Sequence, residues 1–122
     1  MLHIILAEDE PDVRSFLQRA LEYLYPKAQI TAVEDGAAAL ATYERTSANL
    51  IVSDYRMPHL NGIELLRALR RISDTPFVLI SADTSIIEDA YEAGASAVLR
   101  KPLGIRTLRA TLYQWLPAEP SA

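Results

Sequence analysis

Acidic residues follow two short, mostly apolar segments of the chain at the point where each segment ends. Glu8 and Asp9 come directly after residues 3–7, and Asp54 comes directly after residues 50–53. A carboxylate can attack a phosphoryl group and form an aspartyl phosphate. Clustered carboxylates can also hold a hard divalent cation, and Mg²⁺ fits such oxygen ligands best. These acids therefore predict magnesium-assisted phosphoryl transfer, provided that the fold brings the two segment ends together.

A hydroxyl and an amine have the same placement further along the chain. Ser81 ends the apolar residues 77–80, and Lys101 follows residues 97–100. Phosphoryl transfer spreads negative charge over the oxygens of the transferred group, so a cation, an amine and a hydrogen-bond donor would complete the site. Magnesium, Lys101 and Ser81 fill these three roles.

Each of these residues also has an ordinary structural explanation. Acids beside a helix start interact favourably with the helix dipole, so Glu8 and Asp9 alone are a weak signal. A serine at a strand end, such as Ser81, is often a cap, and Lys101 alone is an ordinary surface lysine. Their joint placement at the ends of buried strands favours the site.

The segments that would position these residues alternate between strand and helix patterns. Strands are predicted at residues 3–7, 28–33, 50–53, 77–80 and 97–100. Helical spacing of apolar residues predicts helices at about 11–24, 36–44, 85–93 and 105–116, and one more that Asn61 caps. Such alternation implies right-handed crossovers and a parallel α/β sheet covered on both faces. Strand ends in such a sheet meet where the strand order reverses, so the acids are predicted neighbours.

Apolar side chains on these helices are assigned to packing. Phe16 belongs to the apolar face of the first helix, and Trp115 to that of the last. Leu65 is placed at the edge of the apolar face of the third helix, and Gly94 is predicted to cap the fourth helix at its C-terminal end.

Polar residues outside the candidate site are assigned to solvent. Arg67, Arg70 and Arg71 are interpreted as a solvated helix face. His59 is predicted to be a solvated loop residue, and His3 has no evident partner in the sequence.

Composition limits the classes of function. The chain has 122 residues, 50% hydrophobic and 23% charged, which indicates one globular domain. A net charge of −4 argues against direct nucleic-acid binding, and the absence of cysteine excludes disulfides, thiolate nucleophiles and cysteine-based zinc sites. No apolar stretch approaches the roughly 18 residues of a membrane span, and no secretory signal is visible. A cytosolic protein without a membrane partner is expected.

The motifs resemble those of the receiver domains of two-component response regulators, such as chemotaxis receivers, from about residue 3 to 116. The resemblance is carried by Glu8-Asp9-Glu10-Pro11, Ser53-Asp54-Tyr55-Arg56-Met57-Pro58 through Asn61-Gly62, Ile80-Ser81-Ala82, and Ala93-Gly94-Ala95 leading to Lys101-Pro102. It implies a flavodoxin-like doubly wound sheet of strand order 2-1-3-4-5 with five helices. The receiver domain would comprise residues 1–117, and residues 118–122 a flexible tail.

The resemblance also implies the role of each acid. Asp54 would be the phosphoacceptor, and Glu8, Asp9, Asp54 and the backbone carbonyl of Arg56 would hold magnesium. The phosphoryl group would come from the phosphohistidine of a sensor histidine kinase or a phosphotransfer protein. An unidentified downstream protein or effector domain would read the resulting change.

The same resemblance makes Ser81 the switch hydroxyl and Lys101 the residue that contacts the phosphoryl group, with a cis bond before Pro102. An aromatic residue usually lies three positions before this lysine, but here the position holds Val98. Either the helix predicted at 85–93 shifts without an aromatic reporter, or signalling is uncoupled from that face.

Arg56 and Asp83 lie two residues after Asp54 and Ser81, at positions that flank the mouth of the site in this family. Their opposite charges suggest an ion pair. We hypothesise that this pair forms a partial lid that slows hydrolysis by water, the alternative being two independently solvated charges.

Two other functions fit parts of the pattern. The first is a receiver-like interaction module that no longer uses its aspartate, although no acid, hydroxyl or lysine of the pattern is missing. The second is a magnesium-dependent phosphatase acting on outside substrates, which in the haloacid-dehalogenase class needs a second acid where Arg56 stands. A phosphoacceptor that promotes only its own phosphorylation and dephosphorylation is expected, not an enzyme.

Overall fold

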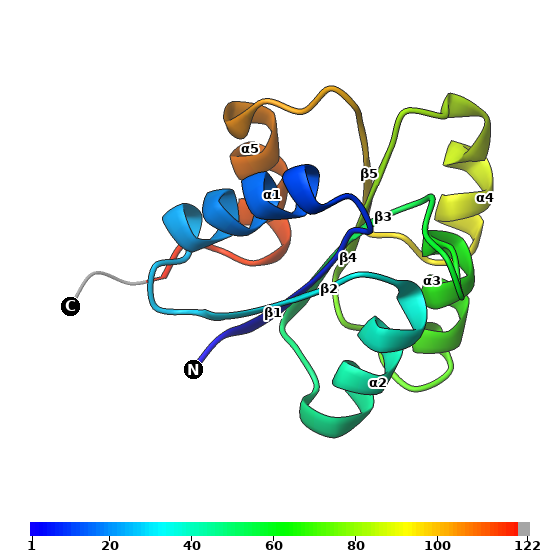
Figure 1. The fold of residues 1–122 in the computed structure, drawn as a ribbon, viewed down its shortest axis with the longest axis horizontal. Coiled ribbons are helices and arrows are strands. Elements are labelled where there is room, and N and C mark those ends of the chain that lie inside the picture. Colours follow the sequence, from blue (N-terminus) through cyan, green and yellow to red (C-terminus); the bar gives the residue numbers. More distant parts are fainter. Residues whose placement is uncertain (120–122) are drawn as a thin grey trace.

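A five-stranded parallel sheet forms the centre of the computed structural model, which describes residues 1–119 (Figure 1). The strand order is β2-β1-β3-β4-β5, which confirms the predicted 2-1-3-4-5 order. The strands are β1 (His3–Ala7), β2 (Gln29–Val33), β3 (Leu50–Asp54), β4 (Phe77–Ser81) and β5 (Ala97–Arg100). The helices are α1 (Pro11–Leu24), α2 (Gly36–Thr46), α3 (Gly62–Arg70), α4 (Ile87–Glu92) and α5 (Ile105–Trp115), and the 3-10 helix η1 (Thr84–Ile86) precedes α4.

Helices cover both faces of the sheet: α1 and α5 lie on one face, and α2, α3 and α4 lie on the other (Figure 1). Successive strand residues point to opposite faces, so Ile4 and Leu6 pack in the α1/α5 core and Ile5 packs in the other. All residues of β3 and β4 are buried. Because each buried aliphatic side chain contributes about 1.5 to 3 kcal/mol, these central strands hold their ends firmly in place.

Two strands extend one residue beyond their predicted ends. β3 includes Asp54 and β4 includes Ser81, because both residues continue the ladder, Asp54 opposite Ile80 and Ser81 opposite Arg100. The phosphoacceptor candidate and the candidate switch hydroxyl therefore lie at the ends of strands and not in loops.

Two helix ends form as the sequence predicts. Asn61 caps α3: its Oδ1 accepts a hydrogen bond from the Glu64 N–H at 2.9 Å, and Glu64 Oε1 accepts one from the Asn61 N–H at 2.8 Å. Gly94 follows α4 with a φ of 106°, a left-handed conformation that suits glycine. The predicted helix over 85–93 is divided, because its first residues form the 3-10 helix η1.

Three apolar side chains differ from their predicted environments. Phe16 and Trp115 are 44% and 43% exposed, and neither belongs to the core between the sheet and helices α1 and α5. Phe16 lines an apolar cleft of about 430 Å³ beside Lys101. Leu65, expected at the edge of the apolar face of its helix, is fully buried in the core on the α2/α3/α4 side of the sheet.

Two polar residues expected to be free of contacts are held by the protein. The Arg70 side chain is only partly exposed, and its guanidinium donates to the Gly94 carbonyl at 3.0 Å. His3 has two partners, with Nδ1 at 2.6 Å from the Ser47 carbonyl and Nε2 at 2.8 Å from Thr31 Oγ1. In both cases the partners come from distant parts of the chain.

No helix within residues 1–119 is long and apolar enough to span a bilayer. Most of the predicted tail, residues 120–122, lies outside the described residues, so its flexibility stays a prediction. Glu119 is described, and its Oε1 accepts a hydrogen bond from the Lys27 N–H at 2.9 Å.

Candidate functional site

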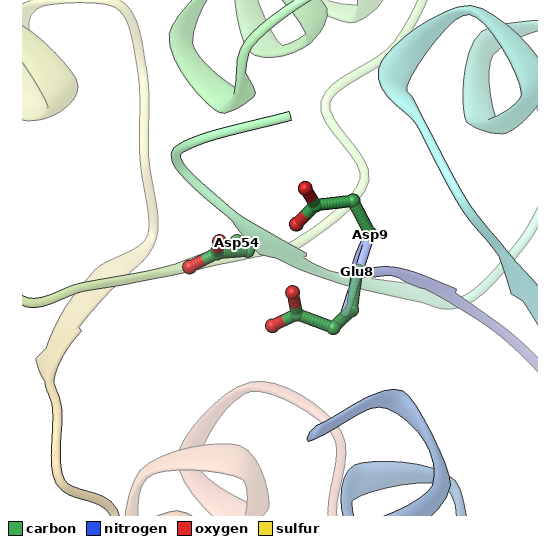
Figure 2. A group of neighbouring side chains, drawn as sticks. All are labelled: Glu8, Asp9 and Asp54. Atoms are coloured by element: carbon green, nitrogen blue, oxygen red, sulfur yellow. The ribbon is translucent and has the colours of Figure 1, made fainter. Parts of the chain in front are cut away.

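The fold brings the three predicted acids together at the carboxyl ends of β1 and β3. These strands are adjacent, with Ala7 opposite Ser53, so the residues that follow in register emerge side by side. One carboxylate oxygen from each of Glu8, Asp9 and Asp54 lies within 4.8 Å of the others (Figure 2). Figure 2 shows Glu8 and Asp9 extending from the end of β1 toward the end of β3, which carries Asp54.

Burial of these acids makes their negative charge costly. Glu8 is fully buried and Asp54 nearly so, whereas Asp9 is exposed. Burial raises the pKa of Glu8 from 4.5 to about 7, and the negative charge of Asp54 contributes to the rise. Burial also raises the pKa of Asp54, although Lys101 opposes the effect. The positive charge of Lys101 therefore does not fully compensate the negative charges of the buried acids near neutral pH.

The uncompensated negative charge makes the three acids suitable ligands for a hard divalent cation. Three carboxylates supply oxygen ligands of the kind that Mg²⁺ prefers, and a bound cation would favour their ionised forms. The role of the Arg56 carbonyl as a further ligand stays a prediction.

Lys101 reaches the acid cluster from the end of β5. Its Nζ lies 3.0 Å from Asp54 Oδ1 and 3.5 Å from Glu8 Oε1. Burial opposes the charged ammonium, but the hydrogen bond and charge of Asp54 outweigh it and raise the pKa of Lys101. The bond between Lys101 and Pro102 is cis, as the resemblance implied.

Ser81 lies at the end of the strand next to Asp54, but its hydroxyl is directed to its own loop. Its Oγ accepts a hydrogen bond from the Asp83 N–H at 2.9 Å and donates one to the Asp83 carbonyl at 3.2 Å. To bind a phosphoryl oxygen, Ser81 would have to exchange the Asp83 carbonyl for that oxygen.

Arg56 and Asp83 form the ion pair that their charges suggested. Arg56 Nη2 lies 3.4 Å from Asp83 Oδ2, and the arginine side chain is 77% exposed. Arg56 also lines a polar cleft of about 410 Å³ with Asp9, Tyr55, Met57 and Asn61. The pair thus lies beside an open approach to the acids.

Arg14 was not identified from the sequence, and Gly62 entered only as part of the resemblance, without a stated role. Arg14 Nη1 donates to the Glu8 carbonyl at 2.9 Å and so supports the turn that carries the acids. A Cβ on Gly62 would come within 2.6 Å of the Asp54 carbonyl, so only glycine lets α3 begin this close to β3. The position of Gly62 directly after the capping Asn61 was the available signal.

His59, expected to be a solvated loop residue, is 72% exposed but has a partner. Its Nδ1 lies 2.9 Å from Asp35 Oδ2, and its φ of 65° is left-handed. The contact joins the loop after Asp54 to the start of α2. The prediction of a solvated loop residue is therefore confirmed, and the structure adds the contact with Asp35.

Comparison with known proteins identifies the family. The family model for the response regulator receiver domain matches residues 4–113. The probable chemotaxis protein CheY of Rhizobium etli is 30% identical over 116 residues, which cover 91% of this chain and 89% of that protein. A cyclic di-GMP phosphodiesterase response regulator of Xanthomonas campestris is 35% identical over 114 residues, 89% of this chain and 30% of that protein. The chain spans only 30% to 39% of the first three curated relatives.

Solved structures of receiver domains have the same fold as this chain. The receiver domain of sensor histidine kinase PA1611 from Pseudomonas aeruginosa, with magnesium coordinated in its active site cleft, superposes with a TM-score of 0.84 at 28% identity, covering 93% of this chain and 96% of that one. Chemotaxis protein CheY4 of Vibrio cholerae gives a TM-score of 0.86 at 26% identity, covering 95% and 99%. The chain therefore belongs to the response regulator receiver domain family of two-component signalling systems.

Proposed function

We propose that Asp54 is the phosphoacceptor and that it receives a phosphoryl group from the phosphohistidine of a sensor histidine kinase or phosphotransfer protein. The observation that carries this proposal is the ion pair between Lys101 and Asp54, set among buried acids of raised pKa. The arrangement places a carboxylate nucleophile and a cation for the transferred group within one small volume.

The reaction requires little proton transfer at Asp54. One Asp54 oxygen attacks phosphorus and forms a phosphorus–oxygen bond as the phosphorus–nitrogen bond breaks. The leaving imidazole nitrogen keeps the electron pair and takes up a proton from water. The Lys101 ammonium neutralises negative charge on the transferred oxygens, and the Ser81 hydroxyl donates to one of them after releasing the Asp83 carbonyl.

Magnesium is the cofactor that the donor set favours. Glu8, Asp9, Asp54 and the Arg56 carbonyl would hold it. When bound, it would neutralise charge on the phosphoryl oxygens. The magnesium in the Pseudomonas receiver structure supports this assignment.

The phosphorylated domain, residues 1–117, would act by changing a protein-binding face for a downstream partner and not by processing outside substrates. Relatives named for enzymes are about three times longer than this chain. The proposed function of residues 1–117 is therefore signalling. Val98 stands where an aromatic reporter usually lies in this family. We therefore propose that α4 moves without such a reporter.

Phosphorylation by a small donor tests the proposal. The protein would be incubated with acetyl phosphate and Mg²⁺, and intact mass would be measured for the parent, Asp54→Asn and the control Asp12→Asn, which alters an exposed acid of α1. One magnesium-dependent phosphoryl group in the parent and the control, absent from Asp54→Asn, is expected. No modification of a folded parent, with a phosphorylated kinase also ineffective, would instead indicate the interaction module.

A further inference from the structure

Arg70 lies outside the phosphoryl site but connects three segments of the fold. It is the last residue of α3, and its Nε and Nη2 donate to the Gly94 carbonyl at 3.0 and 2.9 Å. Its Nη1 donates to the Thr75 carbonyl at 2.7 Å. Because the guanidinium is planar and its donors are fixed, this one group joins the end of α3, the loop before β4 and the turn after α4.

The turn after α4 is shaped around this guanidinium. Gly94 has a φ of 106°, and a Cβ there would lie 3.0 Å from Arg70 Nε. A side chain at this position would therefore strain the backbone and crowd the arginine. The amides that follow are well bonded, with the Ala95 N–H donating to the Ala90 carbonyl and the Ser96 N–H donating to the Phe77 carbonyl.

A second contact holds the same end of α4. The Val98 N–H donates to the Tyr91 hydroxyl at 3.2 Å. β5 is an outer strand of the sheet, so this contact attaches the last turn of α4 to the sheet edge. The C-terminal end of α4 thus has two attachments, neither of which involves a residue of the phosphoryl site.

The N-terminal end of the same segment depends directly on the site. Asp83 Oδ1 accepts hydrogen bonds from the Ser85 N–H at 2.9 Å and the Ser85 hydroxyl at 2.6 Å, which caps η1. The Asp83 N–H in turn donates to Ser81 Oγ at 2.9 Å. A change at Ser81 therefore acts on the beginning of η1 and α4, while Arg70 acts on the end.

We propose that Arg70 anchors the C-terminal end of α4, so that a change of hydrogen-bond partner at Ser81 moves the N-terminal end about a fixed pivot at Gly94. The part that concerns Ser81 rests on the proposed function. The anchor itself does not, because its contacts exist in the unmodified protein.

Hydrogen exchange of the full chain, measured by mass spectrometry, tests the anchor without phosphorylation. Arg70→Met should exchange the amides of 94–96 at least about tenfold faster, because hydrogen bonds from a charged group are lost. In Arg70→Lys these amides should exchange at a rate between those of the parent and Arg70→Met. The control Arg67→Met changes an exposed arginine of α3 and should match the parent. The β1 amides report global unfolding. Equal acceleration of β1, or no acceleration at 94–96, overturns the anchor.

Exchange after treatment with acetyl phosphate and Mg²⁺ tests the pivot. In the parent, the amides of 84–87 should change severalfold while those of 94–96 stay constant, and in Arg70→Met the change should extend to 94–96. Equal changes at both ends of α4 in the parent would overturn the pivot. If intact mass shows no phosphoryl group, the proposed function fails, and the unmodified variants still decide whether Arg70 is an anchor.

Discussion

Lys101 Nζ lies 3.0 Å from Asp54 Oδ1. The residue proposed to accept the phosphoryl group is therefore already paired with the ammonium proposed to neutralise the charge of that group. Asp54 ends β3 and Lys101 directly follows β5, and these two strands flank β4 in the sheet. Because the pair is partly buried, its electrostatic interaction is screened less than that of an exposed pair. Lys101 therefore stabilises the Asp54 carboxylate in the unmodified protein, and in the proposed reaction it would then be available to the phosphoryl oxygens.

Replacement of Lys101 by methionine should slow phosphorylation far more than it alters the fold. Loss of a preorganised charge partner at a reacting group typically costs about 10² to 10³ in rate. The rate of phosphorylation by acetyl phosphate, followed by intact mass, checks this. Arg100→Met is the matched control, since Arg100 is the exposed neighbour at the end of β5. Equal rates in the two variants would remove Lys101 from the reaction.

The raised pKa of Glu8 predicts that the folded protein becomes less stable as the pH increases. Its pKa rises from 4.5 to about 7 on folding, so the folded protein binds the proton more tightly than the unfolded chain does. By linkage, stability falls as pH increases from about 4.5 to about 7. Between pH 5 and pH 8 the loss is on the order of 2 to 3 kcal/mol, because most of the rise in pKa lies in this interval and one pKa unit corresponds to about 1.4 kcal/mol.

Urea unfolding at pH 5 and pH 8 measures this dependence. Glu8→Gln should remove most of the loss, whereas Glu10→Gln, an exposed neighbour, should keep it. Addition of Mg²⁺ at pH 8 should restore stability to the parent, since a cation that binds the folded site stabilises it. A parent that is equally stable at both pH values without metal would contradict the assigned charge cost.

The placement of the site was predictable from the sequence, because it depends on where strands end. Buried strands read as apolar runs, and parallel topology brings their carboxyl ends to one edge. That reasoning places Glu8, Asp54 and Lys101 together without any knowledge of distances. The direction of the Ser81 hydroxyl was not predictable, since it depends on the conformation of the loop through Asp83.

The wrong assignments share a physical cause. Arg70 was placed in solvent because a helix pattern shows which residues share a face, not what lies opposite that face. Its carbonyl partners include that of Gly94, 24 residues away, besides those of Ser73 and Thr75 in the adjoining loop. His3 likewise bonds to Thr31 and Ser47, which only tertiary structure brings near. Local patterns therefore predicted the elements and their ends, while contacts between elements needed the structure.

Ser81→Ala should weaken the start of α4 without preventing phosphorylation of Asp54. The substitution removes the acceptor of the Asp83 N–H, and such a loss costs about 1 kcal/mol. We expect a lower free energy of unfolding by this amount and faster amide exchange at 83–86. Ser81→Thr, which keeps the hydroxyl, should restore both. Unchanged exchange in Ser81→Ala would mean that the hydroxyl does not support the loop.

Arg56→Ala should shorten the lifetime of the phosphorylated protein if the pair with Asp83 acts as a partial lid. Arg56 Nη2 lies 3.4 Å from Asp83 Oδ2, and Arg56 lines the cleft that Asp9 also lines, so its removal would widen the approach of water to the acids. We expect severalfold faster loss of the phosphoryl group, measured by intact mass after the donor is removed. High salt should accelerate hydrolysis in the parent, because exposed ion pairs are screened, and should have little effect on Arg56→Ala. Arg67→Ala serves as the control, and a parent-like rate in Arg56→Ala would show that the two charges are solvated independently.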